Sequence, residues 1–270
     1  MCGIVGYVGS RQCTEVLIDA LSKLEYRGYD SAGIAVFDNG EIKVAKSKGR
    51  LKDLENKMEK EGTPNGFAGI GHTRWATHGE PSDVNSHPHS GERVTIVHNG
   101  IIENYKPLKE FLLSQGRVFQ SETDTEVVAQ LLDYYYDGNP LETIKKVMHE
   151  LEGSFALGIV FADFKDTVYA VRCESPLIVG VGENESFIAS DVPAILKYTK
   201  DYYLLEHGEI AVLNKSGVTV YDRHLTEIEK ELKTADWDMD AAEKGGYEHF
   251  MLKEIHEQPN AIKTTIAPRI

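Results

Sequence analysis

The sequence has few cysteines and no long apolar run. Cys2, Cys13 and Cys173 are the three cysteines in 270 residues. Their odd number and spacing argue against a disulfide framework and against a structural zinc site, so no metal is expected. No stretch approaches the roughly 18 apolar residues of a membrane helix, and the first residues lack the pattern of a signal peptide. We therefore expect a reduced, cytoplasmic protein.

Basic residues are also scarce relative to acidic ones. The chain has 29 Lys and Arg against 43 Asp and Glu, which gives a formal net charge of −14. This charge repels phosphate backbones and anionic lipid, so neither nucleic acid nor a membrane is expected as a partner. Gly3, Gly6 and Gly9 lack the spacing of a dinucleotide-binding turn, and no cofactor is predicted.

What the sequence does contain predicts an α+β fold. Its 41% hydrophobic content is enough for a sizeable core. Apolar periodicity and turn residues predict helices over 13–25, 104–115 and 124–136, strands over 3–9, 69–77 and 94–100, and a hairpin over 33–48. Six further short strands are predicted at 155–162, 167–172, 177–182, 186–190, 209–213 and 217–221, which we interpret as successive antiparallel strands. This distribution favours an α+β sandwich over a doubly wound parallel sheet.

The last part of the chain differs from the rest. Residues 223–246 are highly charged, and a helix-like run follows from 247 to 266. Alternating aspartates at 236–240 are similar to a calcium loop but lack its glycine and its closing glutamate, so a solvated acidic connector is expected. We predict one domain over 1–240 and a connector over 241–270, in a chain that is part of a longer protein.

Cys2 is a candidate nucleophile. Methionine is generally removed before a small residue, so Cys2 would carry both a thiol and a free α-amine. The amine has an ordinary pKa of about 7.7–8 and the thiol about 8.5, so the amine can accept the proton of the thiol near neutral pH. A cysteine at a frayed end is the alternative reading of this position.

Two segments contain polar residues suited to binding. YRGYDSAG at 26–33 places Arg27 and Gly28 in a loop between a helix and a strand, although an arginine in a turn is usually just solvated. GHTRWATHGEP at 71–81 follows a strand, and its binding candidates are Arg74, Trp75, Thr77 and His78. An arginine suits a carboxylate, Thr and His add hydrogen bonds, and Trp can exclude water. An exposed polar loop with a buried tryptophan is the alternative.

Two later segments complete the set. In HNGIIENY at 98–105, the amide of Asn99 and the N–H of Gly100 are the two donors that an oxyanion needs, although Asn-Gly is also a common tight turn. In SETDTEV at 121–127, Asp124 can cap a helix or receive an ammonium group. His87 and His89 lack nearby carboxylates with ligand spacing, so we do not predict a metal site there.

Taken together and in this order, Cys2 with GIVG and the four segments resemble the glutaminase domains of glutamine–fructose-6-phosphate aminotransferases. The resemblance spans essentially the whole chain and includes the closing HFMLKEIHEQP. It implies an N-terminal nucleophile hydrolase fold, a four-layer αββα sandwich of two antiparallel sheets. It also implies that Cys2 attacks the side-chain amide of L-glutamine, forms a thioester and releases ammonia.

The resemblance further implies a role for each matched residue. Asn99 and Gly100 would form the oxyanion hole, and Arg74, helped by Thr77 and His78, would hold the α-carboxylate. The remaining roles concern four residues: Asp124 would receive the α-amine, Arg27 and Gly28 would lie beside the nucleophile, and Trp75 would sit on a lid.

The same resemblance implies partners outside this sequence. A C-terminal sugar-isomerase domain would use the ammonia to convert fructose 6-phosphate to glucosamine 6-phosphate, in a homodimeric enzyme. Three alternatives stay open: the glutaminase domain of a phosphoribosylpyrophosphate amidotransferase or asparagine synthetase, a non-catalytic glutamine-binding module, and a cysteine hydrolase with His78 as base.

Overall fold

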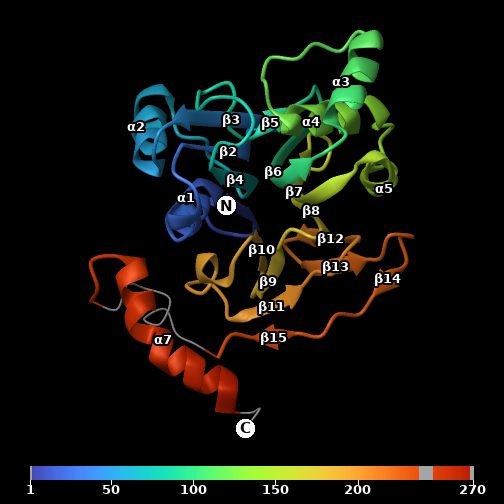
Figure 1. Ribbon diagram of the computed structural model, residues 1–270. Coiled ribbons are helices and arrows are strands. Elements are labelled where there is room, and N and C mark those ends of the chain that lie inside the picture. Colours follow the sequence, from blue (N-terminus) through green and yellow to red (C-terminus); the bar gives the residue numbers. More distant parts are fainter. Residues whose placement is uncertain (1, 237–245, 268–270) are drawn as a thin grey trace. The chain divides into compact units, whose positions relative to one another are not determined.

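A computed structural model describes residues 2–236 and 246–267 (Figure 1). The chain forms two compact units, Met1–Thr234 and Ala235–Ile270. The boundary expected between residues 240 and 241 lies outside the described residues, as does most of the expected acidic connector.

The first unit contains two antiparallel sheets. The eight-stranded sheet has, in spatial order, β15 (Lys233–Thr234), β11 (Asp201–Leu204), β9 (Ile178–Gly182), β10 (Glu185–Ala189), β1 (Gly3–Val8), β4 (Ala68–Arg74), β2 (Ser31–Asp38) and β3 (Glu41–Lys48). The seven-stranded sheet has β14 (Glu227–Ile228), β13 (Gly217–Tyr221), β12 (Glu209–Asn214), β8 (Thr167–Cys173), β7 (Gly153–Phe161), β6 (Val94–Ile102) and β5 (His89–Ser90). Each pairing is antiparallel, as the predicted fold class requires.

Helices cover the outer face of each sheet (Figure 1). The helices α1 (Cys13–Ser22) and α2 (Leu51–Glu61) pack on the eight-stranded sheet through apolar residues such as Leu17, Leu21 and Leu54. On the other side lie α3 (Tyr105–Ser114), α4 (Asp124–Tyr135) and α5 (Pro140–Glu150), which bury residues such as Val128 and Leu131. A third apolar core separates the two sheets. The expected four-layer αββα sandwich is therefore confirmed.

The alternation of side chains along the strands determines what lies between the sheets. On β4, Ala68 and Ile70 belong to the inter-sheet core. Because side chains two residues apart share a face of a strand, His72 and Arg74 continue the same face toward the end of β4. The apolar core thus gives way to polar side chains at one end of the sandwich, close to the start of β1.

Most predicted elements are present, with three differences. The strand expected over 69–77 ends at Arg74, after which the chain forms a loop. The strands predicted as a successive series are divided between the sheets: β8 pairs with β12, whereas β9 and β10 join the sheet of β1. The helices α2 and α5 and the short strands β5, β11, β14 and β15 were not predicted. In α2, Leu51, Leu54 and Met58 form one buried face of an otherwise charged segment.

The hairpin prediction is confirmed in detail. The strands β2 and β3 pair in register from Ser31 with Lys48 to Asp38 with Glu41. Both turn residues have positive φ, 52° at Asn39 and 91° at Gly40, as a type I′ turn requires. The turn matches the right-handed twist of the paired strands.

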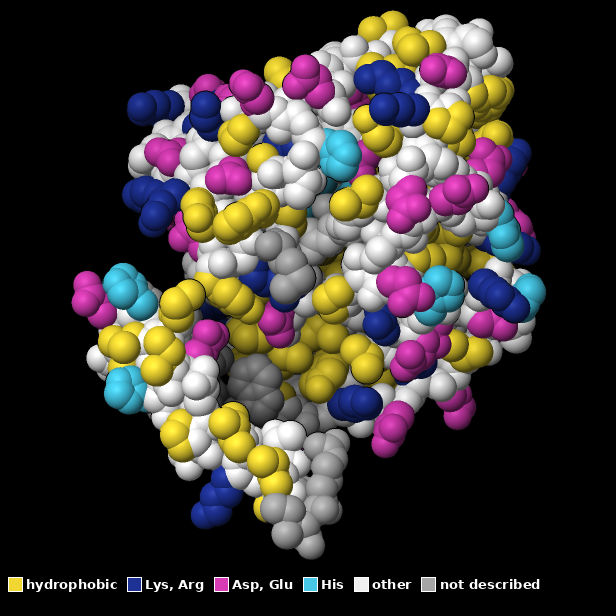
Figure 2. All heavy atoms as spheres, viewed as in Figure 1, with side chains coloured by type: hydrophobic (Ala, Val, Ile, Leu, Met, Phe, Trp, Pro, Cys, Tyr) yellow, Lys and Arg dark blue, Asp and Glu magenta, His cyan; other side chains and the backbone are white. Residues whose placement is uncertain are grey.

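The second unit contains α7 (Phe250–Ile266), where the sequence predicts a helix-like run. Four exposed apolar residues recur at helical spacing along it: Met251, Ile255, Ile262 and Ile266. On the face in view, Figure 2 shows acidic and basic side chains interspersed over the molecule. Among the described helices, none combines the length and apolar character needed to cross a membrane.

Removing apolar volume between the sheets should destabilise the fold. Ile70 is fully buried in the inter-sheet core, so Ile70→Ala should lower the free energy of unfolding by about 2–5 kcal/mol. Val44 on the edge strand β3 is 40% exposed, and Val44→Ala should change it by about 0.5 kcal/mol or less. Urea unfolding measures both values, and equal losses would contradict the assignment of the core.

Candidate active site

Cys2 directly precedes β1, which lies inside the eight-stranded sheet between β10 and β4. Its side chain is half-buried. The backbone N–H of Trp75 donates a hydrogen bond to Cys2 Sγ over 3.2 Å, and the carbonyl of Trp75 lies 3.5 Å from the sulfur as an acceptor for the thiol. The side-chain Nδ2 of Asn99 donates to the carbonyl of Cys2 over 3.1 Å. Contacts to the loop after β4 and to β6 of the other sheet therefore hold Cys2.

The surroundings of Cys2 favour the protonated thiol. Burial raises the pKa of Cys2 above its ordinary value, because desolvation disfavours the thiolate. The Trp75 N–H and the positive charges of Arg74 and Arg27 act in the opposite direction but have a smaller effect. A base within reach of the sulfur is therefore needed to form the nucleophile.

Asn99 and Gly100 lie on β6 of the opposite sheet. The side chain of Asn99 is buried and has the same parity along β6 as Val97 in the inter-sheet core, so it points toward β1. Gly100 has φ of +128°, and a Cβ there would collide with the carbonyl of Ser154. Glycine is thus required at this position, and Gly100 lines the cavity described below.

Arg74 lies at the end of β4 and is almost completely buried. Its Nη2 donates to the carbonyls of His78 and, over 3.1 Å, of Gly79. Its Nη1 is buried and has no hydrogen-bond partner within the described residues. A buried guanidinium with an unused donor is well suited to binding a carboxylate.

Asp124 begins α4, but it does not cap the helix. Thr123 is the N-cap, since its hydroxyl accepts a hydrogen bond from Glu126 N. The capping interpretation of Asp124 is therefore wrong. Instead, Asp124 Oδ2 accepts a hydrogen bond from Ile102 N over 2.9 Å, and the carboxylate is buried. This position leaves its negative charge available at a cavity.

Cys2, Gly100, Arg74 and Asp124 line one small cavity of about 20 Å³, which is room for about one water molecule. Asn99 is not among the described residues that line it. The residues that line it are Cys2, Arg74, Trp75, Thr77, His78, His87, His98, Gly100, Thr123, Asp124 and Thr125. The loop after β4 closes it, because its carbonyls bond to Arg74. A cavity of this size is too small for an amino acid.

The loop carries Trp75, Thr77 and His78. Trp75 is 45% exposed and contacts the ring of Tyr29 edge-on, with centroids 5.6 Å apart. His78 Nδ1 lies 3.4 Å from Thr77 Oγ1, and its ring contacts that of Tyr105. The alternative interpretation of this segment, an exposed polar loop with a buried tryptophan, is therefore wrong about Trp75.

Arg27 and Gly28 are not among the described residues that line the cavity. Arg27 Nη1 bonds to Asp191 Oδ2 over 3.0 Å and to the Ser190 carbonyl over 3.3 Å. At Gly28, a Cβ would lie 2.8 Å from the backbone carbon of Arg74, so glycine is needed for close packing against the loop. The structure places Gly28 against the backbone of Arg74 and Trp75, and contact of Arg27 or Gly28 with substrate stays a prediction.

Four buried histidines cluster at the site, and two of them, His87 and His98, line the cavity. His72 and His87 stack with centroids 4.0 Å apart, and His87 also neighbours His89 and His98 at 5.1 Å and 6.4 Å. Burial lowers the pKa of each, that of His72 to about 3. Within the described part of the chain, no group of His, Cys, Asp or Glu could hold a metal ion. His72 and His98 were missed as candidates, although His72 lies two residues before Arg74 and thus on its face.

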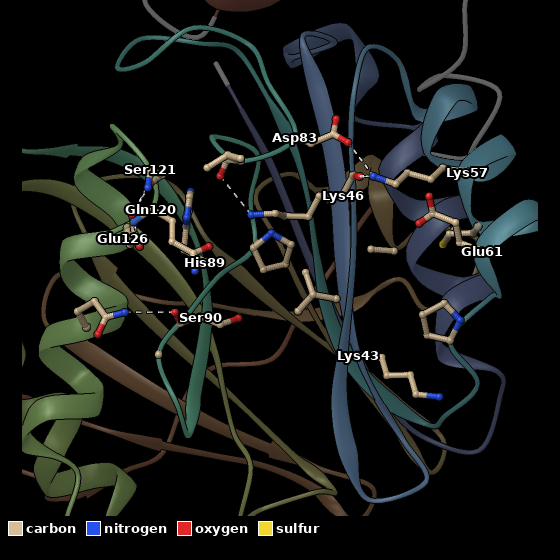
Figure 3. Close-up of a pocket in the computed structure, with 18 of the residues that line it drawn as sticks. Lys43, Lys46, Lys57, Glu61, Asp83, His89, Ser90, Gln120, Ser121 and Glu126 are labelled. Atoms are coloured by element: carbon tan, nitrogen blue, oxygen red, sulfur yellow. Dashed lines mark hydrogen bonds and ion pairs between the residues drawn. The ribbon is translucent and has the colours of Figure 1, made fainter. Parts of the chain in front are cut away.

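A larger hollow of about 800 Å³ lies between β3, α2 and α4 (Figure 3). Its cations are engaged by the protein: Lys57 Nζ lies 2.7 Å from Asp83 Oδ2, Lys46 Nζ donates to the Val84 carbonyl and Lys43 pairs with Asp38. Because Asp83 and Val84 follow the loop that closes the cavity, these bonds attach the end of that loop to β3 and α2.

Comparison with known proteins identifies the family. A model described as a glutamine amidotransferase domain matches residues 72–197, which include Arg74, Asn99 and Asp124. The whole chain aligns with glutamine–fructose-6-phosphate aminotransferases (isomerizing), at 57% identity to the protein of Caldanaerobacter subterraneus subsp. tengcongensis and 49% to that of Thermus thermophilus. The chain belongs to the glutamine amidotransferase family. The predicted resemblance is thus confirmed.

The amidotransferase chain spans 45% of the length of these two relatives. Among solved structures, it is similar to glutamine phosphoribosylpyrophosphate amidotransferase from B. subtilis, with a TM-score of 0.72 and 26% identity over 84% of this chain and 50% of that one. A glutamine aminotransferase class-II domain protein from Silicibacter pomeroyi shares the fold, with a TM-score of 0.58 and 14% identity over 82% and 99% of the two chains.

The raised pKa of the Cys2 thiol predicts slow alkylation. In the chain that carries Met1, iodoacetamide should modify Cys2 more slowly at pH 7.5 than it modifies an unstructured cysteine peptide. The rate should still be rising above pH 8.5, since deprotonation requires a pH above the ordinary thiol pKa of about 8.5. Peptide mass spectrometry separates Cys2 from Cys13 and Cys173. A rate that levels off below pH 8 would contradict the effect of burial.

Proposed function

We propose that this amidotransferase domain hydrolyses L-glutamine to glutamate and ammonia, with Cys2 as the N-terminal nucleophile after removal of Met1. The observation that carries the proposal is one cavity that joins the Cys2 thiol to a buried guanidinium, Arg74, and a buried carboxylate, Asp124. These two charges are opposite to those of an amino acid's α-carboxylate and α-amine. A substrate held by both presents its side chain to the sulfur.

The proposed reaction has two stages. The α-amine of Cys2 takes the thiol proton, and the sulfur attacks the amide carbon of glutamine. The oxyanion receives hydrogen bonds from Asn99 Nδ2 and Gly100 N. The ammonium form of the amine then protonates the leaving group, and ammonia departs as the thioester forms. Water, deprotonated by the same amine, attacks the thioester and releases glutamate and the thiol.

Binding is proposed to combine several residues around the same cavity. Arg74 Nη1 takes the α-carboxylate, with Thr77 and His78 as further donors from the loop, and Asp124 takes the α-amine. Closure of the loop with Trp75 excludes water from the thioester stage. Arg27 and Gly28 support the wall beside the nucleophile.

Two alternatives have less support. A cysteine hydrolase that uses His78 as base needs that ring near the sulfur, but the ring contacts Thr77 and Tyr105, whereas the sulfur contacts the backbone of Trp75. A non-catalytic glutamine-binding module has no use for the hydrogen bond between Asn99 and Cys2. The amine mechanism uses both features.

We also propose the wider setting that the relatives' names suggest. Residues 1–240 act as the glutaminase domain and 241–270 as a connector to a sugar-isomerase domain of a cytoplasmic homodimer. There the ammonia converts fructose 6-phosphate to glucosamine 6-phosphate. The alignment of the whole chain with 45% of glutamine–fructose-6-phosphate aminotransferases supports this setting.

The central test combines intact mass with turnover. The active chain should lack Met1 and release glutamate from glutamine, and glutamine should protect Cys2 from alkylation. Cys2→Ala should abolish turnover. An added residue before Cys2 should also abolish it, because the α-amine is then an amide and cannot act as a base. Full activity in a chain that retains Met1 would rule out the amine mechanism.

The oxyanion assignment predicts a large effect at Asn99. Asn99→Ala should lower kcat by roughly two to three orders of magnitude, as loss of one oxyanion donor typically does. Asn139→Ala is the control, because Asn139 caps α5 in the outer layer and should leave kcat unchanged within about twofold. A loss at Asn99 below tenfold would mean that its amide does not face the oxyanion.

A further inference from the structure

The buried histidine His72 contacts the proposed oxyanion residue directly. It lies on β4 and is fully buried. Its Nε2 is 3.0 Å from Asn99 Oδ1 and 3.0 Å from the carbonyl oxygen of His98. The side chain therefore crosses from the eight-stranded sheet to β6 of the seven-stranded sheet.

The carbonyl of His98 determines which nitrogen of His72 carries the proton. A carbonyl oxygen accepts hydrogen bonds and cannot donate one, so Nε2 must carry a hydrogen. The ring is neutral, since burial lowers the pKa of His72 to about 3, and Nδ1 therefore has only a lone pair. The backbone carbonyl of His98 thus fixes the Nε2–H tautomer of His72, whichever atom of the Asn99 amide faces the ring.

The proton on His72 in turn determines the orientation of the Asn99 amide. An amide NH₂ group pointing at Nε2–H would place two donors against each other, so Asn99 must present its oxygen. Its Nδ2 then points the other way and donates to the carbonyl of Cys2 over 3.1 Å. The second hydrogen of that NH₂ group is left for the substrate oxyanion.

The ring of His72 is itself held in place. It stacks on His87, with centroids 4.0 Å apart and planes inclined by 14°. His87 Nδ1 accepts a hydrogen bond from His98 N over 3.3 Å, and its Nε2 lies 3.3 Å from Thr125 Oγ1. Since Nδ1 is the acceptor, Nε2 of His87 donates to the threonine. A backbone N–H and a residue of α4 thus fix the support of His72.

We propose that His72 is a positioning residue for catalysis, which holds the side-chain amide of Asn99 with its NH₂ group toward Cys2 and the oxyanion. The proposal rests on the proposed glutaminase function. His72 does not touch the reacting atoms and acts through Asn99. Without the donor at Nε2, the Asn99 amide can rotate by 180° and present its oxygen to the developing negative charge.

The test compares two replacements of His72. His72→Gln keeps an N–H donor close to the position of Nε2, whereas His72→Leu removes the donor and keeps an apolar side chain of moderate size. We expect His72→Leu to lower kcat about 10- to 100-fold, less than complete loss of an oxyanion donor, with KM for glutamine changed less than about threefold. His72→Gln should keep kcat within about fivefold of the unaltered chain.

A double-mutant cycle separates positioning from general damage. If His72 acts through Asn99, adding His72→Leu to Asn99→Ala should lower kcat by less than about threefold further. Thermal unfolding of each variant, together with binding of L-glutamate, checks the fold. If His72→Leu fails to fold, His72→Asn replaces it, because asparagine keeps a donor but is too short to reach Asn99. The His72→Asn variant should then lose activity, whereas the His72→Gln variant should retain it.

Three results would overturn the proposal. The first is equal kcat for the His72→Gln and His72→Leu variants. The second is a higher KM for glutamine in His72→Leu with kcat unchanged. The third is that the effects of His72→Leu and Asn99→Ala on kcat are fully additive. They are distinguishable from failure of the proposed function, which would show as absence of glutamate release from the unaltered chain lacking Met1.

Discussion

The hydrogen bond from Asn99 to the carbonyl of Cys2 joins the two sheets where their shared apolar core ends. Its two residues come from opposite layers of the sandwich and are 97 positions apart in the sequence. The bond forms only if β1 and β6 are placed correctly, which depends on the packing of residues such as Ile4, Ile70 and Val97 between the sheets. The geometry of the site therefore depends on the packing of the core between the sheets.

Strand periodicity explains how residues from distant segments meet. Arg74 and His72 continue the inward face of β4, and Asn99 continues that of β6. Neither strand changes its alternation at the site; only the polarity of the side chains changes. The sheets thus hold the groups that require accurate placement, whereas Trp75, Thr77 and His78 lie on the loop that follows β4.

Local patterns in the sequence predict much of the fold. The Asn39-Gly40 turn indicates the hairpin, and the apolar stripe from Val127 indicates α4. The division of β8 and β9 between two sheets is not predictable in this way, because a strand carries no local mark of its partner. The stop of β4 at Arg74 was not predicted either, and there the Arg74 side chain bonds to the carbonyls of His78 and Gly79 in the loop that follows.

The site is predictable only in part, for a related reason. Side chains with evident chemistry, such as Arg74 and Asp124, stand out in their segments, and the structure places both at one cavity. Arg27 is engaged with Asp191, a partner 164 residues away that no motif indicates. Thr123 caps α4, as the backbone geometry shows. The sequence alone does not decide whether Thr123 or Asp124 is the cap.

The buried histidine cluster also makes the fold sensitive to acid. In the folded chain the pKa values of His72, His87, His89 and His98 are lowered, whereas an unfolded chain binds protons at these rings near the ordinary value of about 6.5. The unfolded state therefore takes up more protons as the pH falls below about 6.5, and the folded state loses stability over that range, down to about 3 for His72. Acidification would therefore loosen the junction of the two sheets, where these four rings are buried.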